Sequence, residues 1–283
     1  MNQVFIPIVR FVSALYLAAK NPALAILIFL AGILSVSGQN LKWPHGKKAV
    51  IVLTYDDGLN SHLDIAIPQL DSFGLQGTFF LYGHLSENRF ADWKKTSENG
   101  HETGNHSLFH PCRLEDSAGK SPRFSSENYD IPSMIREIRV MDRLLFAITG
   151  KHAPSYAYPC SETVIGGFDY GESLKETGFF SCARIGGDKT IITDFSNLDY
   201  FKVPSYSVNA GTDASTLICY TEEVLKEKGL GIFVFHGIGG DYLSVDADVH
   251  LELLQFLKSH TNEIWVATFS EVMEYLQDSE QKL

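Results

Sequence analysis

Short apolar runs alternate with longer amphipathic stretches along most of this chain. Seven runs are rich in β-branched and aromatic residues: KAVIVLTY (48–55), GTFFLYG (77–83), SYAYPC (155–160), FFSCARI (179–185), YFKVPSYSV (200–208), GIFVFHG (231–237) and EIWVATF (263–269). Several are apolar almost throughout, as is typical of strands that are covered on both faces. Between them lie helical patterns at 62–74, 131–150, 215–229 and 248–260. Strands that alternate with helices predict a parallel sheet, and seven or eight such units predict a barrel.

The first 38 residues differ from the rest of the chain. They contain Arg10 and Lys20 but no acidic residue, and an apolar run over 23–34 is followed by small residues. This pattern predicts a cleaved secretory signal peptide over residues 1–38, with an uncleaved membrane anchor as the alternative. The protein is therefore expected to be secreted, periplasmic or attached to the cell envelope.

Composition and charge narrow the class of partner. The 283 residues carry a formal net charge of −11, and no cluster of lysine or arginine is longer than a pair. Nucleic acid is therefore not an expected partner, and a neutral or weakly charged substrate is. No linker, repeat or change of composition interrupts the chain after Pro44, so residues 43–280 are expected to form a single domain.

Two adjacent aspartates follow the first apolar run. Asp56 and Asp57 stand at the end of a predicted strand, and Gly58 gives the chain room to turn. The carboxyl ends of barrel strands are where these folds place their chemistry. Roughly one Asp-Asp pair is expected by chance in a chain of this composition. The alternative is a turn in which one aspartate caps the helix that follows.

A pair of histidines forms the second candidate site. His106 and His110 are four residues apart, so on one helical turn both rings would face the same side and bind one metal ion. Two surface histidines are the alternative. Together with a carboxylate from another strand end, the pair would make a two-histidine, one-carboxylate set with open positions on a divalent ion. One aspartate could then bind the ion while the other acts as a base, as in a hydrolase.

The motifs TYDDG (54–58) and HSLFH (106–110) resemble the first two motifs of the polysaccharide deacetylases, the carbohydrate esterases with NodB homology. The resemblance extends from about Lys47 to Leu276, and TFFLYG, GHETGNH and GIFVFHG fall where that family places them. Two motifs in register with these flanks are far more specific than either motif alone. The resemblance implies an α/β fold, a distorted (β/α) barrel of seven to eight parallel strands in a single domain.

The resemblance also implies roles for individual residues. Asp57, His106 and His110 match the ligands of a divalent metal ion, commonly zinc, with Co²⁺, Ni²⁺ and Mn²⁺ as alternatives. Asp56 matches the general base and His236 the general acid, although a packed histidine at a strand end is the alternative for His236. The implied reaction removes acetyl groups from an N-acetylhexosamine polymer or an O-acetylated polysaccharide. An acetylated carbohydrate is therefore the expected partner, and no protein partner is predicted.

The third motif departs from the family pattern. Where the family has Arg-x-Pro-Tyr, this chain has AYPC, so Ala157 replaces the arginine and Cys160 the tyrosine. The N–H of Cys160 could still stabilise an oxyanion, because that role needs no particular side chain. Arg184, at the end of the next predicted strand, is the candidate to replace the arginine that orients Asp56, with a surface arginine as the alternative. Two other functions follow as alternatives: a catalytically impaired carbohydrate-binding protein and a hydrolase of non-sugar amides.

Two further groups of residues remain open from the sequence. An exported protein meets oxidising conditions, so disulfides are expected, and four cysteines allow three pairings. These cysteines are Cys112, Cys160, Cys182 and Cys219. Aromatic residues near the motifs are candidates for stacking on a sugar, with packing as the alternative. They are Tyr82, Trp93, Tyr158 and Tyr242.

Overall fold

The computed structural model describes residues 42–115 and 122–281. The predicted signal peptide over residues 1–38 lies outside these described residues. Within them, no helix combines the length and the apolar character that crossing a membrane would require.

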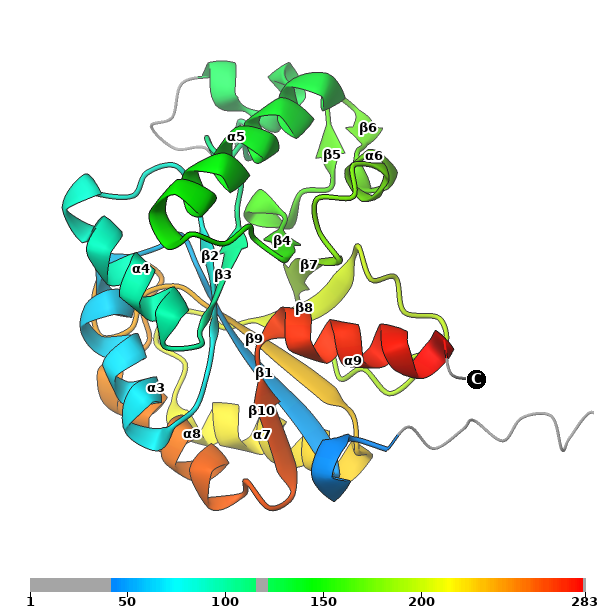
Figure 1. Ribbon diagram of the computed structural model, residues 1–283. Coiled ribbons are helices and arrows are strands. Elements are labelled where there is room, and N and C mark those ends of the chain that lie inside the picture. Colours follow the sequence, from blue (N-terminus) through cyan, green and yellow to red (C-terminus); the bar gives the residue numbers. More distant parts are fainter. Residues whose placement is uncertain (1–41, 116–121, 282–283) are drawn as a thin grey trace, which may run out of the picture. The chain divides into compact units, whose positions relative to one another are not determined.

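Eight parallel strands form one sheet, which closes on itself (Figure 1). Their bounds are β1 Ala49–Asp56, β2 Thr78–Leu81, β3 Glu102–Asn105, β4 Ser155–Ala157, β7 Cys182–Gly187, β8 Val203–Ser207, β9 Leu230–Phe235 and β10 Ile264–Ala267. One edge of β1 pairs with β9, and the other edge pairs first with β10 and then, from Thr54 to Asp56, with β2. Seven strands in the order β1-β2-β3-β4-β7-β8-β9 therefore close a barrel, and β10 is added beside the first half of β1. The expected distorted barrel of seven to eight parallel strands is confirmed.

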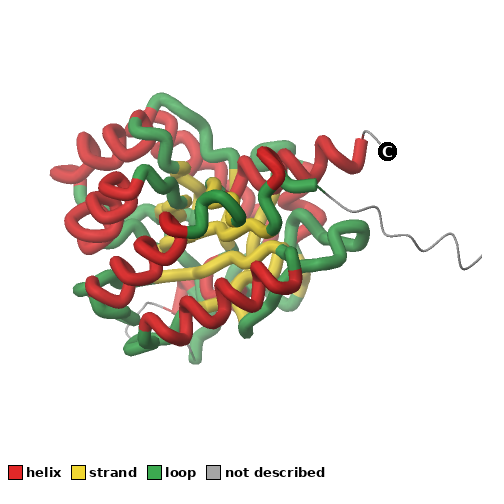
Figure 2. The backbone as a smooth tube through the Cα atoms, turned by 90° about the horizontal axis from the view of Figure 1, so that it is seen from below, coloured by secondary structure: helices red, strands yellow, loops and turns green. Residues whose placement is uncertain are grey.

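Helices surround the strands, as the view from below shows (Figure 2). Their bounds are α3 Ile67–Phe73, α4 Phe90–Glu98, α5 Ile131–Thr149, α6 Gly171–Glu176, α7 Ala214–Glu227, α8 Ala247–Ser259 and α9 Phe269–Gln281. A π-helical turn, η2 His62–Ala66, leads into α3, and a small antiparallel hairpin joins β5 Val164–Ile165 to β6 Phe168–Asp169.

Local capping explains where two of the long helices begin. Oδ1 of Asp130 accepts the N–H of Ser133 at 2.7 Å at the start of α5, and Oδ1 of Asp213 accepts the N–H of Thr216 at 2.7 Å at the start of α7. Each bond satisfies a backbone donor that the first helical turn leaves unpaired. The four predicted helical segments are all helical in the structure.

The strands that form the core coincide with the predicted apolar runs, with one exception. All eight residues of β1 are buried, because its side chains face the barrel interior on one side and the helices on the other. The exception is β3, which reads ETGN and was not among the predicted strands. Glu102 is buried there because its carboxylate accepts hydrogen bonds from Thr78, Ser155 and Ser270. A polar strand can thus enter the core when its acceptors are satisfied.

Candidate metal centre

The carboxyl end of β1 brings both aspartates to the end of the barrel where the other strands also finish. Asp56 is the last residue of β1, opposite Phe80 of β2, and the N–H of Asp57 donates to the C=O of Phe80 at 3.0 Å. Asp57 and Gly58 have φ angles of 79° and 62°, so the chain turns sharply here. The positive φ of Gly58 favours glycine, and a Cβ there would also lie 2.6 Å from Cδ2 of Leu85, so that side chain would have to move. In the first turn of the helix that follows, the N–H of Ser61 donates at 2.8 Å to Oδ2 of Asp241 and not to either of the two aspartates, which argues against the capping alternative.

The two histidines lie on the loop after β3, and this loop is not helical. Ser107 and His110 have φ angles of 65° and 52°, whereas a right-handed helix needs negative φ. The expectation that the histidines share a helical turn is therefore wrong. Oδ1 of Asn105 accepts the N–H of Ser107 at 2.8 Å, and Oγ of Ser107 accepts the N–H of His110 at 3.0 Å. These bonds fold the loop so that Nε2 of His106 and Nε2 of His110 lie 3.1 Å apart.

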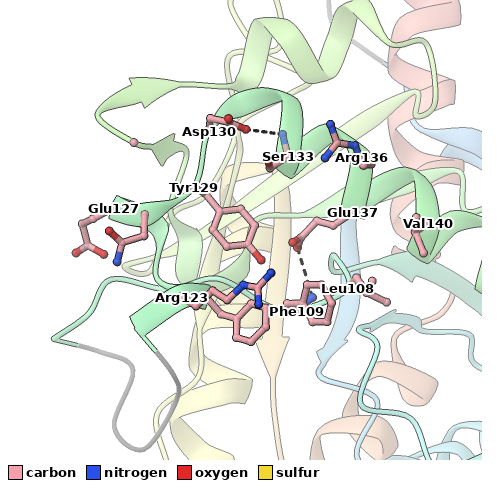
Figure 3. Close-up of a pocket in the computed structure, with 13 residues that line it drawn as sticks. Leu108, Phe109, Arg123, Glu127, Tyr129, Asp130, Ser133, Arg136, Glu137 and Val140 are labelled. Atoms are coloured by element: carbon pink, nitrogen blue, oxygen red, sulfur yellow. Dashed lines mark hydrogen bonds between the residues drawn. The ribbon is translucent and has the colours of Figure 1, made fainter.

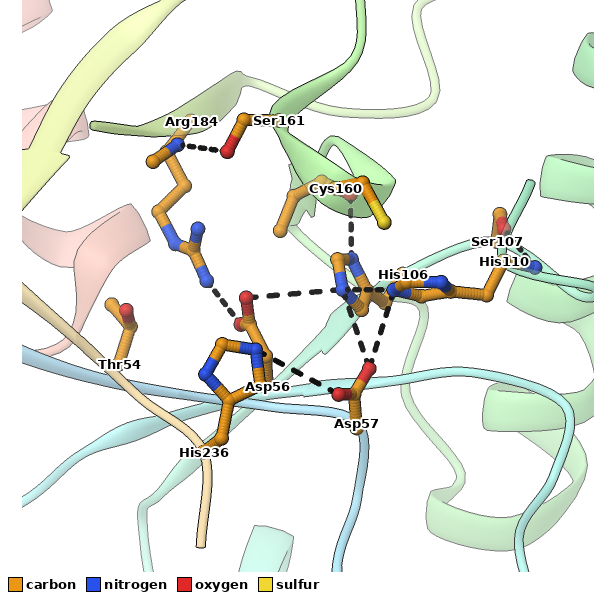
Figure 4. A network of polar contacts seen from close by, with 12 residues as sticks. Thr54, Asp56, Asp57, His106, Ser107, His110, Cys160, Ser161, Arg184 and His236 are labelled. Carbon is orange, nitrogen blue, oxygen red and sulfur yellow. Dashed lines mark hydrogen bonds and ion pairs between the residues drawn. The ribbon is translucent and has the colours of Figure 1, made fainter. Parts of the chain in front are cut away.

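Asp57, His106 and His110 converge on one point (Figure 4). Oδ1 of Asp57 lies 3.3 Å from Nε2 of His110 and 3.6 Å from Nε2 of His106. Nδ1 of His106 lies 2.8 Å from the carbonyl oxygen of Ala157, to which it must donate, so its Nε2 presents a lone pair to the centre. Burial alone would raise the pKa of Asp57, but the two histidines hold it below its ordinary value.

This donor set fits a divalent cation. Oδ1 of Asp57 is buried and has no hydrogen-bond partner within the described part of the chain. A buried carboxylate oxygen without a donor is costly unless a positive charge satisfies it. Two imidazole nitrogens and one carboxylate oxygen are ligands that zinc and similar ions accept, with further positions left for water or substrate.

Tyr242 holds the other oxygen of Asp57. Its hydroxyl donates to Oδ2 at 2.6 Å, although the residue is 49% exposed on the loop between β9 and α8. The sequence indicated Tyr242 only as a candidate for stacking on a sugar. Its contact with Asp57 was missed because the two residues are 185 positions apart and no local pattern connects them.

The other three aromatic candidates differ in position. The ring of Tyr82 lies 5.2 Å from the ring of His110, at the edge of the centre. Trp93 and Tyr158 are each only 1% exposed and belong to the core, so neither can stack on a sugar.

Arg184 forms a buried ion pair with Asp56. Its Nη2 donates to Oδ1 of Asp56, its guanidinium carbon lies 4.7 Å from the centroid of the Phe80 ring, and it is only 1% exposed. The alternative of a surface arginine is therefore wrong. In the pairing of β4 with β7, Ala157 is the register partner of Arg184. Register partners on parallel strands project from the same face of the sheet, so Arg184 supplies a guanidinium one strand away from the motif position that lacks it.

The ion pair sets the charge of Asp56. Burial alone would raise the pKa of this carboxyl group, but the nearby guanidinium, together with His106 and His236, lowers it to about 2. Asp56 is therefore ionised at neutral pH. Its second oxygen, Oδ2, lies 3.8 Å from Nε2 of His106, on the side of the candidate metal ligands.

His236 follows β9 and completes the group. Its Nε2 lies 3.8 Å from Oδ2 of Asp57, and its Nδ1 is buried without a hydrogen-bond partner among the described residues. Nε2 of His62 donates to the carbonyl oxygen of His236 at 2.7 Å, because Nδ1 of His62 already accepts the N–H of Leu59 at 3.2 Å. His62, to which the sequence assigned no role, therefore ties the turn after β1 to the end of β9.

One disulfide joins Cys112 to Cys160, so none of the three complete pairings of four cysteines is formed. Cys182 and Cys219 are free thiols, the first buried and the second exposed. Cys160 lies in the turn η6 Pro159–Ser161, with a φ of 50°. The disulfide connects this turn to the chain just after His110 and brings Cys160 beside the two histidines (Figure 4).

A pocket of about 730 Å³ lies behind the histidine loop (Figure 3). Leu108 and Phe109 line it together with the start of α5, and Oε1 of Glu137 accepts the N–H of Phe109 at 3.4 Å. None of the predicted site residues lines this pocket. It therefore shares the histidine loop with the candidate metal centre but is separate from it.

Residues 44–165 match the family model described as polysaccharide deacetylase. Among solved structures, the fold is similar to a putative polysaccharide deacetylase from Mycobacterium smegmatis, with a TM-score of 0.62, 14% identity, and coverage of 85% of this chain and 94% of that chain. It is also similar to the catalytic domain of a peptidoglycan N-acetylglucosamine deacetylase from Eubacterium rectale, with a TM-score of 0.53, 13% identity, and coverage of 83% and 94%. At these identities the likeness shows the fold alone.

A curated relative supports the same assignment over a shorter stretch. The chain is 36% identical over 66 residues to the peptidoglycan-N-acetylmuramic acid deacetylase PdaA of Bacillus subtilis, which is 23% of this chain and 25% of that protein. The match thus spans about a quarter of the length of the curated relatives. The family model thus covers the stretch that contains both TYDDG and HSLFH, and over that stretch the chain is similar to the polysaccharide deacetylases.

Proposed function

We propose that this protein is a metal-dependent hydrolase that removes acetyl groups from an acetylated oligo- or polysaccharide. One observation carries the proposal: an orphaned oxygen of Asp57 and two imidazole nitrogens converge on one point beside the buried Asp56–Arg184 ion pair. The match of residues 44–165 to the polysaccharide deacetylase family model supports the chemical class of the substrate.

Asp57, His106 and His110 would hold the ion, which we take to be zinc, with Co²⁺, Ni²⁺ and Mn²⁺ as alternatives. A divalent ion there supplies Lewis acidity, which polarises a carbonyl oxygen and makes a water molecule more acidic. Tyr242 would keep the carboxylate of Asp57 in place through its bond to Oδ2.

Asp56 would act as the general base. Arg184 holds Oδ1, so the carboxylate cannot rotate freely, and Oδ2 remains directed toward the candidate metal ligands. From this position Asp56 would take the proton from the water that attacks the acetyl carbonyl. Its pKa of about 2 keeps the base ionised, although it makes the carboxylate a weak base.

His236 would act as the general acid, on the opposite side of Asp57 from the histidine loop. Its side chain is 23% exposed, so a leaving amine or alcohol could reach it from solvent. The N–H of Cys160 would donate to the oxyanion that forms at the carbonyl. The products would be acetate and a free amine or hydroxyl group on the sugar.

The structure bears on the two alternatives in different ways. The case for a catalytically impaired carbohydrate-binding protein was the missing arginine at Ala157, and the ion pair of Arg184 with Asp56 weighs against that alternative. A hydrolase of non-sugar amides would use the same residues and is distinguished by substrate alone. We further propose that the protein acts outside the cytoplasm, because residues 1–38 have the pattern of a signal peptide.

Acetate release tests the proposal. The protein is stripped of metal, then given zinc, and offered peptidoglycan, chitin oligomers, acetylxylan and a set of small amides. Zinc-dependent release from a carbohydrate, lost in Asp56→Asn, is the expected result. Release from the small amides alone would favour the second alternative. Zinc binding with no release from any substrate would favour the first.

A further inference from the structure

The imidazole of His110 faces two different groups of candidate ligands. Its Nε2 lies 3.3 Å from Oδ1 of Asp57, in the centre described above. Its Nδ1 lies 3.4 Å from Sγ of Cys112, on the other side of the ring. The candidate ligand atoms of His110, Cys112 and Cys160 all lie within 4.8 Å of one another.

We propose that reduction of the Cys112–Cys160 disulfide opens a second metal site, formed by Nδ1 of His110 and the two sulfur atoms. Two thiolates and an imidazole are ligands for soft or borderline divalent ions, zinc above all. Water would occupy the fourth position, because Cys160 is exposed to solvent.

A reductant of the dithiol or phosphine class would reduce the Cys112–Cys160 disulfide. Two electrons cleave the sulfur–sulfur bond and two protons give two thiols. A dithiol supplies both electrons and protons and becomes a disulfide, whereas a phosphine takes oxygen from water, which provides the protons, and becomes a phosphine oxide. When the ion binds, two metal–sulfur bonds form and the two thiol protons are released.

The fold would keep the two thiols close after reduction. Zinc–sulfur bonds of about 2.3 Å in a tetrahedral site place two sulfurs about 3.8 Å apart, which side-chain rotation can reach from a Cα–Cα distance of 5.6 Å. A second link spans the same two turns, because Nε of Arg113 pairs with Oε2 of Glu162. This ion pair is independent of the disulfide.

The two sites would exclude each other, because they share one ring. A neutral imidazole has one lone pair and one N–H. If Nδ1 of His110 binds the ion between the thiolates, Nε2 carries the proton, and the site with Asp57 and His106 loses a ligand. The redox state of the disulfide would therefore select which site holds the ion. The resulting loss of deacetylase activity rests on the proposed function, but the second site does not.

Cobalt binding tests this proposal without an activity assay. The full chain carrying Cys219→Ser, which removes the exposed free thiol, is prepared oxidised and after reduction with a phosphine that is then removed without oxygen. Each form is titrated with Co²⁺. The reduced form should bind one equivalent and show a thiolate-to-cobalt charge-transfer band in the near ultraviolet, which the oxidised form lacks. In zinc competition, the reduced form should bind at least about tenfold more tightly.

Two variants separate the sites. Cys112→Ser combined with Cys160→Ser should abolish the charge-transfer band, while Asp57→Asn should keep it in the reduced form and weaken cobalt binding in the oxidised form. Absence of the band in the reduced protein would overturn the second site, and two equivalents bound together would overturn the shared ring. Oxidised protein whose cobalt binding is unaffected by Asp57→Asn would instead count against the proposed function.

Discussion

Removal of the arginine that pairs with Asp56 is the most direct test of the charge balance at this site. In Arg184→Ala, the carboxylate of Asp56 stays buried and loses its nearest positive charge. The pKa of Asp56 is about 2 in the folded protein against an ordinary value of 3.8, and this difference corresponds to about 2 kcal/mol of stability at neutral pH. Breaking a buried ion pair from one side costs about 3–5 kcal/mol, because the remaining charge is uncompensated.

The sign of the pH dependence follows from the same pair. A depressed carboxyl pKa gives stability that is present above the unfolded pKa of 3.8 and is lost as the pH falls toward 2. Without Arg184, burial dominates and the pKa of Asp56 rises, so the variant takes up a proton as the pH falls toward 4. The stability difference between the two proteins should therefore be largest near neutral pH and should shrink on acidification.

Denaturant unfolding of the metal-free protein, with a chelator present, measures this difference. We expect Arg184→Ala to lose about 3–5 kcal/mol at pH 7 and less at pH 4. Arg143→Ala, an exposed arginine on α5, is the matched control and should change stability by less than about 0.5 kcal/mol. A loss below about 1 kcal/mol, or a loss equal at both pH values, would refute the reasoning. If folded Arg184→Ala protein also retains full kcat/KM, Arg184 has no role in orienting the base.

Three other predictions concern the surroundings of the centre. Burial lowers the pKa of His62 to about 4, so stability that is present above pH 6.5 should be lost between pH 6.5 and 4, by up to about 3 kcal/mol. In His62→Gln this part of the pH dependence of the free energy of unfolding should disappear. The same pH dependence in both proteins would contradict the prediction. Gly58→Ala should lower the thermal unfolding temperature more than Gly74→Ala does. Both glycines have φ near 60°, but only a Cβ at Gly58 would contact a neighbouring side chain. Equal losses in the two variants would leave backbone strain as the sole cause. Tyr242→Phe should weaken zinc binding about tenfold in a competition assay, since Asp57 loses the donor to Oδ2, whereas unchanged affinity would show that this bond does not tune the ligand.

The sequence alone predicted the barrel and most of its candidate site, because these features are encoded over short stretches. A strand covered on both faces must be apolar over four to eight residues, and such runs marked seven of the eight strands. The carboxyl ends of parallel strands meet at one end of a barrel, so Asp56 and Asp57 were expected at a candidate site, whereas His236 was assigned only through the family resemblance. Arg184 was singled out for the same reason, by its place at a strand end.

Tertiary structure decided what depends on the register and on the path of loops. The ring nitrogens of His106 and His110 meet through a loop with positive φ angles, which four-residue spacing cannot reveal. Strand β3 does not show the apolar pattern, because it contains Glu102. The carboxylate of Glu102 is buried among three hydrogen-bond donors that are distant in sequence. Arg184 reaches Asp56 because the register of β4 and β7 sets it beside Ala157, and the same closure of the barrel brings Tyr242 to Asp57. Contacts across 100 or more positions carry no local signature, since chain closure and side-chain packing select them only when the whole barrel forms.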